Sequence, residues 1–257
     1  MGVVNITPDS FSDGGQFLAV DAAVAQARRL ADEGAAIIDI GAESTRPGAR
    51  AISEDEELAR LMPVLEAIRD LPLPISVDTR RARVMRAALD AGASMINDVE
   101  ALVLPGALEA VAASDCAVCL MHKKGDPATM QQDPHYADVV TEVAEFLALR
   151  VAAAEAAGIA RARIVIDPGF GFGKSADHNL ELLRSLDRLG ELGVPVLAGL
   201  SRKSLLGAIT GRPVGDRAAA SVAAALLAAQ HRATILRVHD VAATRDALAI
   251  WRAVEAR

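Results

Sequence analysis

The sequence alternates short apolar runs with longer runs rich in alanine and leucine, and it does so eight times. Apolar runs of about four to eight residues are typical of buried strands, and the longer runs have the length of helices. We expect strands at 1–6, 36–40, 74–77, 94–97, 116–121, 163–166, 195–198 and 234–238. We expect helices near 20–33, 54–70, 81–90, 105–113, 137–157, 178–190, 216–230 and 241–255.

Glycine stands between several of these helices and the strands that follow. Gly34, Gly92 and Gly158 each precede a strand by a few residues, as glycines that cap a helix do. Regular strand–helix alternation with such short joints predicts a parallel sheet. Eight units in 257 residues have the size of a (β/α)8 TIM barrel, so we expect a single catalytic domain over 1–257. The alternative is a doubly wound sheet, which usually has fewer strands.

Polar residues collect where the expected strands end, and the loops that follow are longer than those that return to the next strand. These residues are Asn5, Glu43, Asp78, Asn97, His122, Asp167, Ser201 and His239. In a (β/α)8 barrel all the carboxyl ends of the strands meet at one rim, where catalysis takes place. The sequence therefore predicts a binding site built from this rim.

The last strand carries two cationic groups on one face. Arg237 and His239 are two residues apart, and alternate residues of a strand share a face. The whole chain has a net charge of −7, which argues against a nucleic-acid-binding surface. A local cationic pair in an acidic chain predicts a site for a small anion. No apolar run approaches the length of a membrane span, so we expect no membrane insertion.

Other rim residues suggest what the remaining part of the ligand looks like. Asp78, Asn97 and Asp167 present acceptors and donors that suit a heterocycle with an amino-amide edge, although a structural network of ion pairs is the alternative. Lys203 could donate to a carbonyl of the same ring, or lie in a basic surface turn. Asn5 could bind Mg²⁺ if a diphosphate supplied the other oxygens. For Arg46, an anion clamp and a solvated loop residue are equally open.

Several common site types are excluded. The glycine-rich segment 169–175 lacks the spacing of a P-loop, since only three residues separate Gly169 from Gly173. No Gly-x-Ser-x-Gly or His-Glu-x-x-His pattern occurs, so nucleophilic serine and zinc-protease chemistry have no support. Cys116 and Cys119 are three apart in an expected strand, which places them on opposite faces and predicts a packing role. This cysteine usage fits a reducing cytoplasm.

Taken together, the motifs resemble those of the dihydropteroate synthase family. They are NITPDSFSDGG (5–15), ESTRP (43–47), SVDT (76–79), IND (96–98), DPGFGFGK (167–174), SRKS (201–204) and RVHD (237–240), in the family's order along the chain. The resemblance implies a pterin-binding barrel that joins 6-hydroxymethyl-7,8-dihydropterin diphosphate to 4-aminobenzoate with Mg²⁺. The products would be 7,8-dihydropteroate and pyrophosphate in folate biosynthesis, and the enzyme would be a sulfonamide target.

The resemblance also implies a role for each matching residue. The pterin would be held by Asp78, Asn97, Asp167 and Lys203. The diphosphate would be held by Asn5, Thr45, Arg46, Arg237 and His239, with Asn5 on the metal. The 4-aminobenzoate would be lined by Phe11, Thr45, Pro47, Phe172 and Ser204, with Asp13 in the loop that closes over it. Asp78, Lys203, Arg237 and His239 would be the catalytic set.

Two features depart from the family pattern. The chain begins close to its first motif, so the barrel floor is expected to be less covered. Lys123 and Lys124 stand where uncharged residues are usual, which puts the contacts of the fifth loop in question. The family resemblance suggests a cytoplasmic homodimer. Two rival functions remain: a pterin-barrel methyltransferase that moves a methyl group from methyltetrahydrofolate to a corrinoid, and a non-catalytic pterin-binding protein.

Overall fold

The computed structural model describes residues 1–6, 15–44, 51–126 and 129–256. Its strands are β1 (Gly2–Asn5), β2 (Ile38–Gly41), β3 (Ile75–Asp78), β4 (Met95–Asp98), β5 (Ala117–Met121), β6 (Ile164–Asp167), β7 (Leu197–Ala198) and β8 (Ile235–Leu236). All eight lie within about two residues of their expected positions at the carboxyl end.

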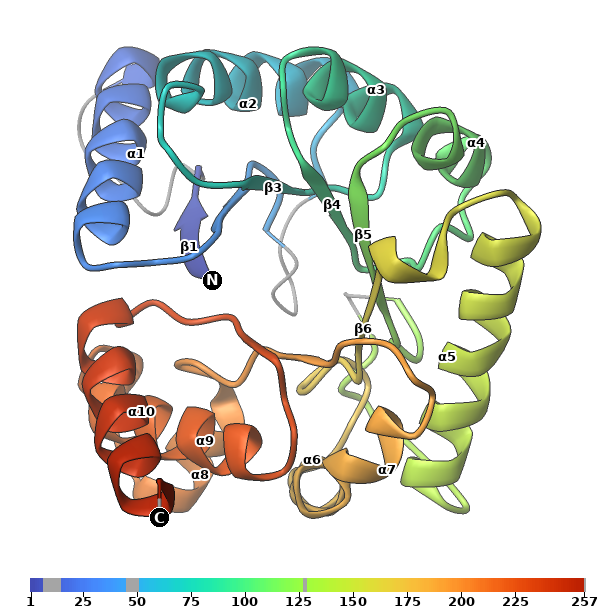
Figure 1. The fold of residues 1–257 in the computed structure, drawn as a ribbon, viewed down its shortest axis with the longest axis vertical. Coiled ribbons are helices and arrows are strands. Elements are labelled where there is room, and N and C mark those ends of the chain that lie inside the picture. The colour runs from blue at the N-terminus through green and yellow to red at the C-terminus, as the bar shows by residue number, and fades with distance from the viewer. Residues whose placement is uncertain (7–14, 45–50, 127–128, 257) are drawn as a thin grey trace.

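The strands form one closed parallel ring. Strands β1 to β6 pair in chain order, and β7 pairs with β8. Two single parallel bridges complete the circle, Ile166 with Val196 and Gly2 with Val238. The expected (β/α)8 barrel is thereby confirmed, and the doubly wound alternative is wrong. Figure 1 shows the helices as an outer ring around these strands.

The helices are α1 (Gly15–Asp32), α2 (Glu54–Ile68), α3 (Ala82–Asp90), α4 (Ala107–Ala112), α5 (Val139–Ala156), α6 (Ala176–Arg184), α7 (Leu186–Gly190), α8 (Ser204–Thr210), α9 (Ala218–Gln230) and α10 (Val241–Glu255). The run expected as one helix over 178–190 is two helices, because the backbone leaves helical geometry at Ser185. Helix α8 lies in the loop after β7, so the seventh unit contributes two helices. None of the described helices is long and apolar enough to cross a membrane.

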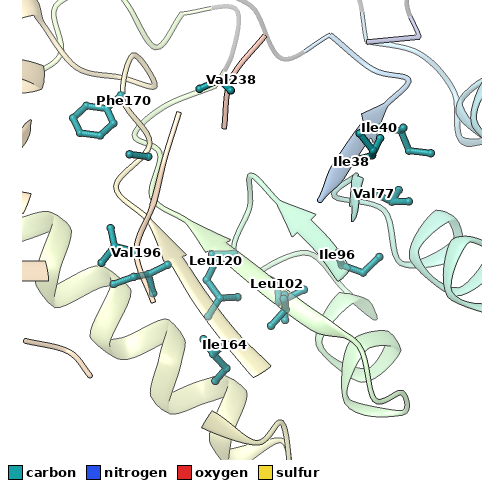
Figure 2. Close-up of a cluster of buried hydrophobic side chains, with 14 of the residues drawn as sticks. Ile38, Ile40, Val77, Ile96, Leu102, Leu120, Ile164, Phe170, Val196 and Val238 are labelled. Carbon is teal, nitrogen blue, oxygen red and sulfur yellow. The ribbon is translucent and has the colours of Figure 1, made fainter. Parts of the chain in front are cut away.

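Apolar side chains fill both sides of the strand ring. The larger cluster lies between strands and helices and includes the labelled side chains of Figure 2, such as Ile38, Ile96 and Ile164. A smaller cluster fills the barrel interior and contains Cys119, whereas Cys116 belongs to the outer cluster. Both thiols are buried and unpaired. The expectation that these cysteines pack on opposite faces is therefore confirmed.

The pairing register sets which polar residues face the barrel interior at one level. Asn5, Gly41, Asp78 and Asn97 are successive register partners across β1 to β4. Residues paired in register on parallel strands share a face of the sheet. Asp78 and Asn97 therefore stand side by side at the carboxyl rim, and Asn5 lies at the same level on the far side of Gly41.

Candidate active site

Arg237 crosses the barrel mouth to two carboxylates. Its Nε donates to Oδ2 of Asp39 at 2.6 Å, and its Nη2 donates to Oδ2 of Asp78 at 2.9 Å. These residues come from the segment after β8, from β2 and from β3. Arg237, which is expected to bind an anionic ligand, thus also has two carboxylate partners within the chain. These partners stand on strands two and three places from β8 around the closed ring.

Asp39 is a site residue that the sequence reasoning missed. Its side chain is 0% exposed, and besides Arg237 it accepts a 3.4 Å hydrogen bond from the amide of Asn97. The available signal was an aspartate between Ile38 and Ile40 in an otherwise apolar strand. A charge at the centre of a buried strand is costly unless a partner neutralises it. Here that partner is Arg237.

Burial and mutual charge set the protonation of this cluster. Burial raises the pKa of Asp78 to about 7, and the neighbouring Arg237 opposes that rise while Asp39 adds to it. Burial lowers the pKa of Arg237, but the attraction of Asp39 and Asp78 outweighs it, so the pKa of Arg237 is raised. The guanidinium therefore stays charged, and the carboxyl of Asp78 titrates near neutral pH.

A second acid–base pair occupies the other side of the mouth. Asp167, the last residue of β6, is buried and accepts the backbone N–H of Gly169 at 2.7 Å. Burial raises the pKa of Asp167, and the positive charge of Lys203 opposes the rise. Burial likewise lowers the pKa of Lys203 to about 8, opposed mainly by Asp167. The Lys203 ammonium donates to the carbonyl of Phe170 and lies 4.7 Å from the ring centroid of Phe172.

The glycine-rich loop after β6 is held against the loop after β5. Gly169 and Gly173 have positive φ, and a Cβ on either would lie 1.9 Å from the carbonyl oxygen of His122 or 2.0 Å from that of Lys124. Lys174 is buried, and its ammonium donates to the carbonyls of Gly169 (3.0 Å) and Phe172 (3.1 Å). It also lies 2.9 Å from Nδ1 of His122. This close packing fixes the position of Phe172 relative to Lys203.

His239 lies beside the loop after β7. Its backbone N–H donates to the Oγ of Ser201 at 3.2 Å, and its ring Nδ1 is 2.9 Å from the same oxygen. The next residues of the two loops are joined by an ion pair between Arg202 and Asp240 at 2.7 Å. Arg237 and His239 both follow β8 instead of lying within it, as β8 ends at Leu236. Arg237 contacts residues of β2 and β3, whereas His239 contacts the loop after β7.

The remaining expected site residues divide into two groups. Asn5 is half-buried at the end of β1, and Ser204 is exposed as the first residue of α8. Phe11, Asp13, Thr45, Arg46 and Pro47 lie outside the described residues.

Charged residues next to the site form a structural network. Glu43 pairs with Arg80 and Arg81, and Arg81 also pairs with the buried Glu57. Glu43, expected among the polar residues of the rim, is thus held by two arginines of the chain. Lys123, one of the two unusual lysines, pairs with Glu100 at 2.7 Å. Lys124 pairs with Glu142 at 3.1 Å and lies over the ring of Tyr136. Both lysines are therefore neutralised within the chain.

A metal ion would have to be held with help from a substrate. Among the residues that the structure describes, no group of three His, Cys, Asp or Glu side chains could hold one. Asn5 offers one amide oxygen at the rim, level with Asp78. Mg²⁺ is commonly bound through one or two protein oxygens plus substrate phosphates and water. The residues present fit that kind of site.

Comparison with known proteins agrees with this geometry. Residues 1–239 match the model of the pterin-binding enzyme family. The dihydropteroate synthase of Haemophilus influenzae is 51% identical over 254 residues, which cover 98% of this chain and 92% of that protein.

Two solved structures are also similar to this chain over its whole length. The Xanthomonas albilineans dihydropteroate synthase with 4-aminobenzoic acid is 59% identical with a TM-score of 0.94, covering 100% of this chain and 92% of that one. A second structure from that organism, in complex with 7,8-dihydropteroate, is 56% identical with a TM-score of 0.91, covering 100% and 93%. The chain therefore belongs to the dihydropteroate synthases, within the family of pterin-binding enzymes.

Proposed function

We propose that the chain condenses 6-hydroxymethyl-7,8-dihydropterin diphosphate with 4-aminobenzoate, giving 7,8-dihydropteroate and pyrophosphate for folate biosynthesis. The observation that carries this proposal is that one barrel mouth holds two carboxylates, the partly exposed Asp78 and the buried Asp167, together with Arg237, which is paired with Asp78, and Lys203, whose charge acts on Asp167. Such a mouth can bind a polar ring and a polyanion at once. Family membership supports the same assignment.

The pterin ring would lie between strands β3, β4 and β6. Asp167 would accept from the amino edge of the ring, and Asn97 and Asp78 would complete its hydrogen bonds. Lys203 would donate to the ring carbonyl. Its ammonium already donates to the carbonyl of Phe170 and lies close to the ring of Phe172. Buried donors and acceptors of this kind select a ligand strongly, since the wrong ring leaves them unpaired.

The diphosphate would lie toward β1 and β8. Arg237 and His239 would bind its oxygens, with Thr45 and Arg46 from the second loop. Asn5 would hold Mg²⁺ together with diphosphate oxygens, which would neutralise part of the charge on the leaving group.

The 4-aminobenzoate would enter beside Phe172 and Ser204, with Phe11, Thr45 and Pro47 completing the pocket and Asp13 in the closing loop. Phe172 is half-buried next to Lys203, and Ser204 is exposed at the start of α8, so both are available to a second substrate. A sulfonamide would compete for this position as a mimic of 4-aminobenzoate.

The reaction would be a dissociative substitution. The bond between the pterin methylene carbon and the diphosphate oxygen breaks, and its electron pair leaves with pyrophosphate. The neutral amine then forms the new carbon–nitrogen bond and loses a proton to water. Arg237 and His239 meet charge that grows on the leaving oxygens, so they stabilise the transition state more than the ground state. Ionised Asp78 and Asp167 offset the positive charge that grows on the pterin.

We further propose that residues 1–257 form one catalytic domain, and that the enzyme is a cytoplasmic homodimer. The closed ring from β1 to β8 supports the first statement, because its strands come from both ends of the chain. Two buried free thiols accord with a reducing compartment.

The test is to incubate the protein with both substrates and Mg²⁺ and to measure pyrophosphate. Release that depends on 4-aminobenzoate supports the proposal. A protein that binds the pterin but releases no pyrophosphate is the non-catalytic alternative. A protein that instead demethylates methyltetrahydrofolate in the presence of a corrinoid is the methyltransferase, which has no use for Arg237 and His239 as a diphosphate pair.

A further inference from the structure

Asp39 is a fully buried carboxylate that the proposed reaction does not itself use. It lies at the middle of β2, one level below the rim, and its register partners are Val3 and Ser76. Taking a carboxylate out of water costs several kcal/mol even after the structure relaxes. A buried carboxylate therefore needs a partner that offsets this desolvation free energy, and the contacts of Asp39 identify that partner.

The contacts of Asp39 reach two residues with expected roles in substrate binding. Its Oδ2 accepts from Nε of Arg237 at 2.6 Å and from the amide of Asn97 at 3.4 Å. Nε lies on the inner edge of the guanidinium, so this bond fixes the side chain without using the terminal Nη groups. A guanidinium carries five N–H donors in a rigid planar fork. Because the guanidinium is rigid, holding Nε also fixes the orientation of its two Nη groups.

The second partner of Arg237 is placed differently. Asp78 is the last residue of β3 and its side chain is 14% exposed, whereas Asp39 is 0% exposed. Asp78 receives its bond from Nη2, one of the groups that point outward along the fork. Because Asp78 is the more exposed partner, a ligand oxygen that enters the mouth would meet the Nη2 bond before the Nε bond, which ends on the fully buried Asp39.

We infer that Asp39 is a positioning residue that holds Arg237 by Nε throughout turnover, while Asp78 holds the Nη groups only until the diphosphate takes its place. Asp39 does not touch substrate and acts mainly through Arg237, because its hydrogen bond from the Asn97 amide is much longer. Release from Arg237 leaves Asp78 free to bind the pterin, so arrival of the diphosphate completes the pterin site as well. This inference rests on the proposed function of Arg237 as a diphosphate ligand.

The first test uses Asp39→Asn, which keeps the shape and one oxygen acceptor but removes the charge. Pyrophosphate affinity, measured by calorimetry, is expected to fall by about tenfold or more, and kcat with it, because the fork is no longer held by an ion pair. The affinity for 6-hydroxymethylpterin without phosphate, and the KM for 4-aminobenzoate, are expected to change by less than about threefold. Equal losses for the pterin and for pyrophosphate, or no loss at all, would overturn the inference.

Two controls separate positioning from general damage. Ser76→Ala changes a buried residue in register with Asp39 and is expected to leave pyrophosphate affinity as it is in the wild type. When Asp39→Asn and Arg237→Lys are combined in a double-mutant cycle, their losses of pyrophosphate affinity should be strongly non-additive. A lysine has no guanidinium Nε–H for Asp39 to hold, so removing Asp39 should cost little more in that background. Independent, additive losses would contradict action through Arg237.

A wild-type measurement keeps the test valid if Asp39→Asn does not fold. In protein labelled with ¹⁵N-arginine, the Nε–H of Arg237 should be protected from exchange and should keep its shift when pyrophosphate is added, while the Nη signals move. An Nε–H that exchanges freely, or moves as much as the Nη signals, would refute the fixed anchor. Wild-type protein that releases no pyrophosphate would refute the proposed function instead, so the two failures are distinguishable.

Discussion

Nη2 of Arg237 lies 2.9 Å from Oδ2 of Asp78, although each of these residues is expected to bind a different part of the substrate. Arg237, which is expected to bind the diphosphate, and Asp78, which is expected to bind the pterin, therefore neutralise each other in the barrel mouth. Both side chains are largely buried, at 22% and 14% exposed, so binding would exchange one set of ionic contacts for another. The effect of this exchange can be measured separately on the binding of the pterin and on the departure of the diphosphate.

Replacing Arg237 should affect turnover more than pterin binding. Arg237→Ala is expected to depress kcat/KM with the pterin diphosphate by far more than it weakens binding of the pterin alone, because the guanidinium meets charge that grows on the leaving group. If both fell by the same factor, Arg237 would be a uniform binder. The same change should lower the free energy of unfolding by about 3–5 kcal/mol, since it leaves Asp39 buried without its cation.

Asp167→Asn should remove most of the pterin affinity. An asparagine can still accept the backbone N–H of Gly169, so the loop is preserved and only the anionic acceptor for the amino edge is lost. The matched control is Asp98→Asn. Asp98 is also buried, but it accepts the N–H groups of Glu100 and Leu102, away from the mouth. Calorimetry should find a large loss of pterin affinity for the first variant and little for the second. Unchanged affinity in Asp167→Asn would remove this residue from the pterin site.

The pH dependence of kcat/KM should be bell-shaped with its maximum between about 7 and 8. The carboxyl of Asp78 has a pKa raised to about 7, so the ionised form is gained as the pH rises through 7. The ammonium of Lys203 has a pKa lowered to about 8, so the charged donor is lost as the pH rises through 8. Activity needs the first group ionised and the second protonated. Asp78→Asn should abolish the acidic limb, and an acidic limb that persists in this variant would assign it to another group.

Crowding the glycine-rich loop should affect the second substrate. In Gly173→Ala the new Cβ would lie 2.0 Å from the carbonyl oxygen of Lys124, so the loop that carries Phe172 must shift. The KM for 4-aminobenzoate is expected to rise by about tenfold, equivalent to about 1.4 kcal/mol. Gly158→Ala is the control, because Gly158 also has positive φ but has no neighbour within 4 Å of the new methyl group. An equal effect of both changes would mean that backbone strain alone is responsible.

The sequence predicts the ring of strands and most of the rim because both depend on local patterns. Strand ends such as Asp78 and Asn97 are recognisable from an apolar run followed by a polar residue, and the structure places them side by side. Asp39 could not be assigned in this way. In a closed parallel barrel both faces of a strand are buried, so an apolar run does not tell which face points inward.

The partner of Asp39 is 198 positions away in the sequence. Their contact exists only because the bridge between Gly2 and Val238 closes the ring and brings the segment after β8 next to β1 and β2. The same reason explains why the carboxylate partners of Arg237 could not be predicted, since Asp39 and Asp78 lie far from it in the sequence. Closure is a property of the whole chain, and no local pattern encodes which side chains it brings together.

The most direct measurement of the central claim is the stoichiometry of the reaction catalysed by the purified protein. With 6-hydroxymethyl-7,8-dihydropterin diphosphate, 4-aminobenzoate and Mg²⁺, we expect one pyrophosphate for each 7,8-dihydropteroate formed, and a rate that collapses in Arg237→Ala. Pterin binding without either product, or equal rates for the wild type and Arg237→Ala, would contradict the account.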